Sequence, residues 1–191
     1  MSATTTPTRE IDGRTVPAAG TWQVDTAHSS VEFVARHLVV TKVRGRFADW
    51  SAELVIGERP EDSRVDVTIQ AASFATGDAN RDGHVISPDF LDVERFPTIT
   101  FTTTSVSAGQ GDGWDVLGDL TIHGVTKPVT LAVEFGGAAQ DPWGNTKAGF
   151  SASTEIDRED FGLTWNQALE TGGVLISKNI RIEIEVQAVQ G

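Results

Sequence analysis

The chain contains four histidines, the residue type most often used to bind metals and to transfer protons near neutral pH. No two of them lie three or four residues apart, so the sequence holds no local pair of zinc ligands. A zinc site would need residues that are distant in the chain to converge. An isolated histidine in a folded domain is more often a structural group with satisfied hydrogen bonds. The four positions are His28, His37, His84 and His123.

A second pattern, Asp78-Ala79-Asn80-Arg81-Asp82-Gly83, resembles the opening of a calcium-binding loop. Such loops place oxygen ligands at alternate positions and a glycine at the sharp turn. The last ligand position is occupied by Asp89 instead of the longer glutamate, Pro88 lies inside the loop, and no pair of amphipathic helices flanks it. We therefore expect neither a metal nor any other cofactor.

The segment Asp157-Arg158-Glu159-Asp160 places one arginine among three carboxylates. One interpretation is a catalytic acid–base pair. The alternative, which we favour, is a solvated turn held by local ion pairs. The sequence has no nucleophile elbow, phosphate-binding glycine loop or dinucleotide fingerprint. Catalysis therefore has little support.

The segment from Ser87 to Pro97 interrupts an otherwise strand-like chain with a compact apolar turn. Ser87 and Pro88 suit the cap and first position of a helix, and Phe96-Pro97 ends any helix because the residue before proline prefers extended geometry. The sequence thus predicts a short helical insert containing Phe90 and Leu91 that plugs or flaps over one end of a barrel. The alternative is an ordinary crossover that covers a core edge.

Most of the remaining chain alternates apolar and polar residues with a period of two, as half-buried strands do. The clearest examples are residues 65–70, 129–135 and 180–188. Roughly eight to ten such strands with short turns predict a closed antiparallel barrel or a sandwich. Small residues beside large ones in the inward rows favour a barrel with an internal cavity, as at Ala148–Ala152.

The composition limits the compartments and the classes of binding partner that we expect. The net charge of −12 disfavours nucleic acids and anionic membrane surfaces as partners. The chain lacks cysteine and any run of apolar residues long enough to insert stably in a membrane. Residues 1–20 have no apolar signal-peptide core, so we expect a disordered polar tail and a cytoplasmic protein. The folded domain is expected over residues 21–191.

Four stretches together resemble the YceI family of bacterial lipid-binding proteins, over about Thr21 to Val189. They are VDTAHSSVEFVARHL (24–38), RDGHVISPDFLDVERFPTITF (81–101), GDLTIHGVTKPVTL (118–131) and IDREDFGLTWNQALETGGVLI (156–176). The resemblance implies an all-β fold: an extended eight-stranded antiparallel barrel, similar to lipocalins, around a long apolar tunnel. It also implies binding of a long-chain isoprenoid lipid, such as an isoprenoid quinone or its precursor, for transport, storage or sequestration without turnover.

Alternation along the strands predicts which side chains line such a tunnel, and the insert supplies two at its mouth. Two histidines, His37 and His84, are candidates for contact with a polar headgroup or, in an alternative lipid-modifying enzyme, for catalysis. A second alternative is a ligand-free structural or stress module whose barrel is filled by its own side chains. An exposed strand edge is also compatible with a homodimer. The predicted ligand-binding residues are Phe33, His37, Phe47, Phe74, His84, Phe90, Leu91, Phe101, Leu131, Phe150, Trp165 and Ile182.

Overall fold

The computed structural model describes residues 7–38, 40–168 and 174–191, and its secondary structure is mostly strand. One α-helix, α1 (Ala79–Ile86), and short 3-10 helices, among them η1 (Thr26–His28) and η4 (Arg158–Phe161), connect the strands. The strands are β1 (Thr8–Ile11), β2 (Arg14–Pro17), β3 (Gly20–Val24), β4 (Ser30–His37), β5 (Thr41–Phe47), β6 (Trp50–Ile56), β7 (Arg64–Gln70), β8 (Phe74–Ala75), β9 (Thr98–Ala108), β10 (Trp114–Ile122), β11 (Val125–Gln140), β12 (Thr146–Asp157) and β13 (Asn179–Gln190).

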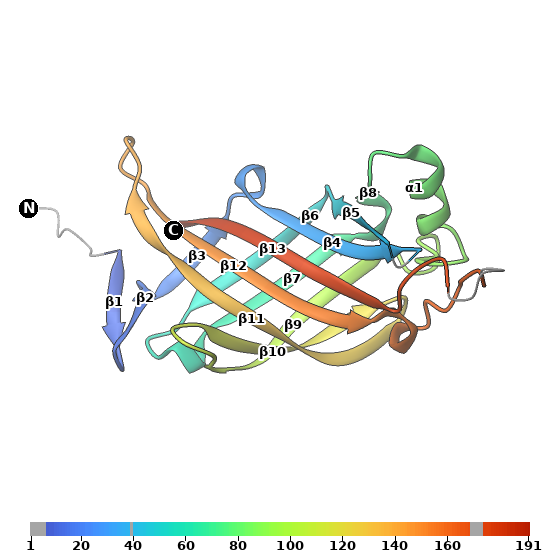
Figure 1. Ribbon diagram of the computed structural model, residues 1–191. Coiled ribbons are helices and arrows are strands. Elements are labelled where there is room, and N and C mark those ends of the chain that lie inside the picture. The colour runs from blue at the N-terminus through green and yellow to red at the C-terminus, as the bar shows by residue number, and fades with distance from the viewer. Residues whose placement is uncertain (1–6, 39, 169–173) are drawn as a thin grey trace, which may run out of the picture.

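Eight strands form a closed antiparallel barrel in the order β12-β11-β10-β9-β7-β6-β3-β13, and the pairing of β12 with β13 closes the ring. The other edge of β13 pairs with β3 through residues 188–190 and with β4 through residues 181–185. Strands β4, β5 and β8 extend the sheet beyond the ring. Figure 1 shows the elongated barrel. The expected all-β, eight-stranded antiparallel barrel with a short helix is therefore confirmed.

Two glycines let aromatic rings lie flat against the barrel wall. A Cβ added at Gly45 would lie 2.2 Å from the Phe33 ring, and one at Gly118 would lie 2.3 Å from the Phe101 ring. Any larger residue would push these rings away from the wall, because a contact this short is sterically impossible.

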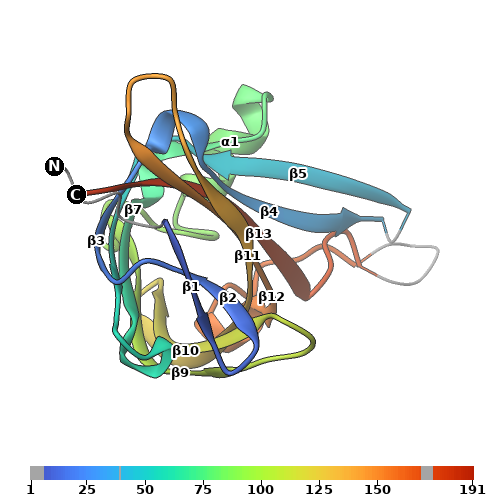
Figure 2. The ribbon, with the colours of Figure 1, turned by 90° about the vertical axis from the view of Figure 1, so that its left-hand side faces the viewer.

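The N-terminal segment is not a disordered tail over its whole length. Strands β1 and β2 form an antiparallel hairpin around Asp12-Gly13, where both residues have positive φ (52° and 77°). This is the Asp-Gly turn that favours two-residue hairpins. The expected tail over residues 1–20 is thus wrong for residues 8–17, while residues 1–6 lie outside the described part. Figure 2 shows the hairpin in front of one end of the barrel, which we call the hairpin end.

The helix lies earlier in the chain than predicted. The side chain of Asp78 caps α1 by accepting hydrogen bonds from the amides of Asn80 and Arg81, at 3.0 Å each. Ser87 caps the C-terminus of α1, and Pro88 follows it because proline cannot continue a helix. The helix start predicted at Ser87 is therefore wrong, and Phe90 and Leu91 lie in the turns that follow α1.

Residues 78–83, which resemble the opening of a calcium-binding loop, instead form the cap and first turns of α1. The Asp78 carboxylate is used as a cap, and Asp82 Oδ1 accepts hydrogen bonds from the amide and hydroxyl of Thr76. In the described part of the chain, no three His, Asp or Glu side chains cluster closely enough to hold a metal ion. The helix α1 lies at the opposite end of the barrel from the hairpin (Figure 1), and we call this the helix end.

Candidate functional site

The barrel encloses an elongated apolar cavity of about 410 Å³. Its wall extends from Val16 and Pro17 at the hairpin end to Val85 and Phe90 at the helix end. The inward rows of the barrel strands supply most of the wall, as the period of two predicts: Val65, Val67 and Ile69 from β7, for example. The volume lies within the range of about 300–1,000 Å³ that is typical of sites for small molecules.

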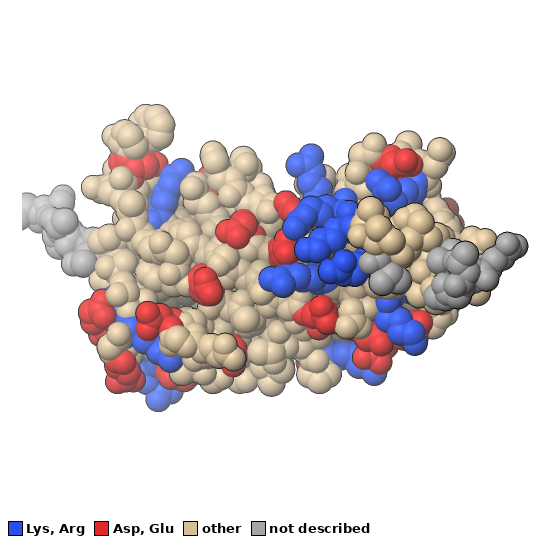
Figure 3. Space-filling view, viewed as in Figure 1, with Lys and Arg blue, Asp and Glu red and all other residues tan. Residues whose placement is uncertain are grey.

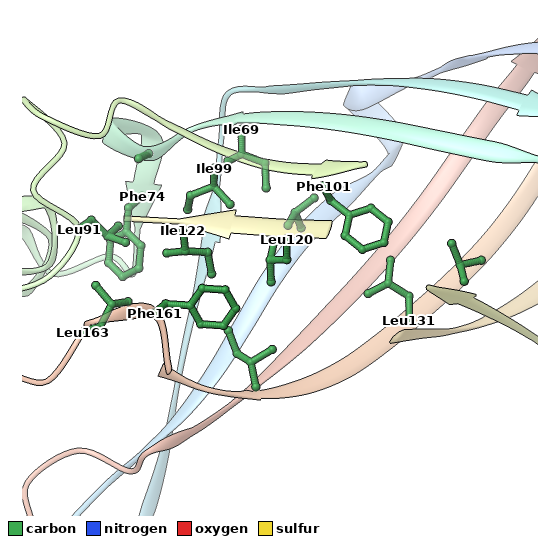
Figure 4. Packing of buried hydrophobic residues seen from close by; sticks show 14 of the residues in the cluster. Ile69, Phe74, Leu91, Ile99, Phe101, Leu120, Ile122, Leu131, Phe161 and Leu163 are labelled. Atoms are coloured by element: carbon green, nitrogen blue, oxygen red, sulfur yellow. The ribbon is translucent and has the colours of Figure 1, made fainter. Parts of the chain in front are cut away.

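Eleven of the twelve predicted ligand-binding residues lie on this wall. Near the helix end, Phe33, Phe47 and Phe74 form an aromatic cluster with ring centroids 4.8 to 6.3 Å apart. Figure 4 shows buried residues of the apolar core, among them Phe74, Phe101 and Leu131. The other predicted residues on the wall are His37, His84, Phe90, Leu91, Phe150 and Ile182.

The twelfth residue, Trp165, does not line the cavity. Its ring packs edge-on against His84, with centroids 4.6 Å apart, and against Phe90, with centroids 5.2 Å apart. It therefore joins the segment after η4 to α1 and to the turns that follow α1. The irregular sequence around Trp165 has no strand periodicity, so alternation could not assign its direction.

The two candidate histidines differ in their surroundings. His84 lies on the wall, and its Nε2 is 2.9 Å from Asp89 Oδ2 on the outer surface. His37 ends β4, where its backbone forms an isolated bridge with Ile176. Both histidines line the cavity, His37 at the end of β4 and His84 in α1.

The deepest polar group on the wall is Arg158, which is only 3% exposed. Its Nε donates to the carbonyl of Ser177 at 3.0 Å, and its Nη1 donates to the carbonyls of Leu163 and Trp165. Burial lowers the pKa of the guanidinium, because the cation loses its hydration, while Glu159 and Asp157 oppose this shift. The interpretation of residues 157–160 as a solvated turn is therefore wrong for Arg158.

The signal that locates Arg158 was present in the sequence. The inward positions of β12 are Ala148, Phe150, Ala152, Thr154 and Ile156, and the next position of the same parity is 158. Continuing the alternation by one step predicts that Arg158 points inward. The carboxylates around Arg158 hid this, because they indicated an exposed turn.

The outer surface contrasts with this wall. Figure 3 shows acidic residues spread over one face and a group of basic residues gathered near β4 and β5. Exposed members of this group are Arg36, Lys42, Arg44 and Arg46, and Arg44 pairs with Glu183 at 2.6 Å. Of the described helices, none has the length and apolar character needed to cross a bilayer. The charged groups are thus mostly outside the barrel.

Comparison with protein families gives a match to the YceI-like domain over residues 22–188. The chain is 43% identical to a UPF0312 protein of Vibrio vulnificus over 149 residues, which are 76% of this chain and 78% of the relative. It is 36% identical to a UPF0312 protein of Pseudomonas savastanoi over 164 residues, which are 85% of this chain and 82% of that protein.

Solved structures show the same fold. BcnA of Burkholderia cenocepacia superposes with a TM-score of 0.74 at 25% identity, covering 86% of this chain and 98% of BcnA. The YCEI protein of Campylobacter jejuni gives a TM-score of 0.69 at 32% identity, over 82% and 90% of the two chains. A polyisoprenoid binding domain from Saccharophagus degradans gives 0.62 at 15% identity, over 91% and 100%, and this likeness concerns the fold alone.

Proposed function

We propose, since the chain belongs to the YceI-like domain family, that its tunnel holds a long-chain isoprenoid lipid for transport, storage or sequestration, without chemical turnover. The observation that carries this proposal is the elongated cavity of about 410 Å³ with its apolar wall. A structural neighbour is named as a polyisoprenoid binding domain, which makes an isoprenoid chain a reasonable class of ligand for the same fold.

The energetics of such binding need no special polar chemistry. Each CH₂ group transferred from water to an apolar site contributes about 0.8 kcal/mol, so one isoprene unit contributes a few kcal/mol before ordering costs. A few units in contact with the wall are enough for tight binding. An isoprenoid quinone or its precursor fits this requirement.

The passive role is supported by the chemistry of the wall. Its most deeply buried ionisable group, Arg158, cannot act as a general base because arginine stays protonated in proteins. A barrel filled by its own side chains, as a purely structural module would have, does not agree with the internal volume. Carriage of a lipid uses that volume directly.

The proposal is tested by mass spectrometry of organic extract from protein purified without detergent. We expect a lipid with an isoprenoid chain in the wild type and its loss in Ala152→Phe, which places a ring in the cavity from β12. The matched control is Ser153→Phe, which adds the same ring on the opposite face of the same strand. Absence of lipid from the wild type, or equal retention in Ala152→Phe, would contradict the proposal.

A further inference from the structure

Buried polar groups normally have a hydrogen-bond partner, and one nitrogen of Arg158 departs from this rule in the described part of the chain. Among the described residues, no acceptor lies within hydrogen-bond distance of Nη2, although this atom is buried. Leaving such a donor unsatisfied destabilises the folded protein, and the cost is larger for a charged group. The other nitrogens, Nε and Nη1, already donate to backbone carbonyls. The guanidinium is thus held in place with one edge unused.

The positive charge of Arg158 is also unpaired within the described residues. No carboxylate in the described ranges lies within ion-pair distance of it. Its sequence neighbours are otherwise engaged, because Glu159 pairs with Lys178 at 2.7 Å and Asp157 accepts from the amide of Glu159. A buried cation without a counterion is costly, and an anionic oxygen is its best complement.

The position of Arg158 in the cavity defines how a ligand would lie. It follows β12 directly and binds the carbonyl of Trp165, whose ring contacts His84 of α1. Arg158 therefore lies at the helix end of the cavity, while the apolar wall continues to Val16 at the hairpin end. A ligand with one charged terminus and a long apolar chain matches this arrangement.

We propose that Arg158 is a headgroup anchor: its Nη2 binds the anionic oxygen of a lipid carboxylate while the apolar chain extends toward the hairpin end. This inference rests on the proposed lipid-binding function and adds the chemical class of the headgroup. The three backbone carbonyls hold the guanidinium rigidly, so little side-chain entropy is lost when the ligand binds. Arg158 binds and orients the ligand and takes no part in any reaction.

The test uses three ligands that share one branched chain: phytanic acid, phytanol and phytane. Their dissociation constants are measured by displacement of a fluorescent lipid from the wild type, Arg158→Gln and Arg158→Lys. We expect Arg158→Gln to weaken phytanic acid by about tenfold or more, because a charge-assisted hydrogen bond is lost. Phytane should bind unchanged, and Arg158→Lys should recover part of the affinity for the acid because it retains the charge.

The possible outcomes separate the two proposals. If Arg158→Gln weakens all three ligands equally, Arg158 only stabilises the surrounding loop. If Arg158→Gln does not weaken phytanic acid, Arg158 does not bind the headgroup. Either result overturns the proposed anchor. If wild type binds phytane and phytanol normally but the anchor fails, lipid binding stands. If wild type binds none of the three ligands, the proposed function fails and the anchor with it.

A measurement on the wild type covers the case in which the Arg158 variants do not fold. Phytanic acid labelled with ¹³C at the carboxyl reports its ionisation by NMR. Next to the guanidinium, the bound carboxyl should stay ionised at neutral pH despite burial. A bound carboxyl that is protonated at neutral pH has no cation beside it and overturns the proposal.

Discussion

The two ends of the barrel are closed in different ways. At the hairpin end, Val16 is 2% exposed and Trp22 is 1% exposed, so the hairpin and the strand after it are packed into the core. At the helix end, α1 has no buried residue, although the turns that follow it bury Phe90 and Leu91. A closed end needs apolar burial, whereas an end that opens must be stabilised by interactions that can be released.

The polar contacts also hold the hairpin end more firmly than the helix end. Arg9 of β1 donates to the carbonyls of Gly57 and Glu58 at 2.7 and 2.8 Å, and Arg14 of β2 donates to the carbonyl of Gly113. The helix is held by the Asp78 cap and by the contact of His84 with the ring of Trp165. We infer that the helix end is the mouth of the tunnel and that the hairpin end stays closed.

The largest expected effect comes from placing a charge in the closed end. Val16→Asp buries a carboxylate without a partner, so we expect the hairpin to lose about 3 kcal/mol or more of docking stability. Amide hydrogen exchange at Ala18, whose N–H donates to Pro7 at 3.0 Å, measures this loss. Dissociation of bound lipid should also become faster, since a second opening forms.

The same substitution at Val85 of α1 is the matched test of the other end. Val85 lies on the cavity wall but is only half-buried, so a carboxylate there stays closer to water and costs less. Exchange near α1 should rise less than exchange at Ala18 does in Val16→Asp. If Val85→Asp is the more disruptive variant, the comparison of the two ends is wrong.

A smaller effect is expected when a polar contact of the hairpin end is removed. Arg9→Ala deletes bonds from a cation to three backbone carbonyls, those of Pro17, Gly57 and Glu58, and should cost about 2 kcal/mol of hairpin docking. The control is Arg59→Ala, because Arg59 is exposed and pairs only with Asp62 beside it among the described side chains. Thermal unfolding and exchange at Ala18 should be unchanged in the control; equal effects would assign no special role to Arg9.

The sequence predicted the barrel better than its ends, for a physical reason. Strand alternation follows from the geometry of the chain, and it placed Phe33, Phe101 and Ile182 on the cavity wall. The ends depend on caps and turns, where several local solutions compete. Ser87-Pro88 fits the start of a helix as well as its end, and only the alternative cap at Asp78 decides between them.

The β1–β2 hairpin was not predicted, although the sequence contains a signal for its turn. Asp12-Gly13 is a strong two-residue turn signal, but its flanking strands are short and polar, so they resembled a tail. The family match starts at residue 22, so the hairpin lies before the matched domain. Arg158 was missed for a related reason. Its charged neighbours indicated an exposed turn, although the alternation along β12 predicts that position 158 points inward.

The contacts of Trp165 offer a test of the mouth itself. Trp165→Ala removes two aromatic contacts, each contributing about 0.5–1.5 kcal/mol, between the segment after η4 and the helix end. We expect bound lipid to dissociate about fivefold to tenfold faster with little change in global stability. Trp143→Ala is the control, because Trp143 is 83% exposed in the turn between β11 and β12. An unchanged dissociation rate in Trp165→Ala would show that lipid does not leave past Trp165 and that the mouth lies elsewhere.

The smallest expected effect is a difference in acid sensitivity between the helix end and the hairpin end. The amides of Arg81 and Asn80 donate to the Asp78 carboxylate and lower its pKa, with a further contribution from the nearby Arg81 guanidinium. Because the folded-state pKa is the lower one, this cap stabilises α1 above the ordinary pKa of an aspartate and is lost as pH falls through the folded value. The arginine-to-carbonyl bonds of the hairpin end do not titrate in this range.

Acidification below about pH 4 should therefore increase hydrogen exchange in α1 before it affects the hairpin. Asp78→Asn retains a side-chain oxygen that can cap the helix but cannot change its charge, so its α1 amides should lose this acid sensitivity. Other carboxylates with lowered pKa values, such as Asp25 and Asp141, act on global stability and are common to both proteins. Their contribution cancels in the difference between wild type and Asp78→Asn at each pH. An acid response that is equal in the two proteins, or that begins at Ala18, would show that the helix end is not the end released by protonation.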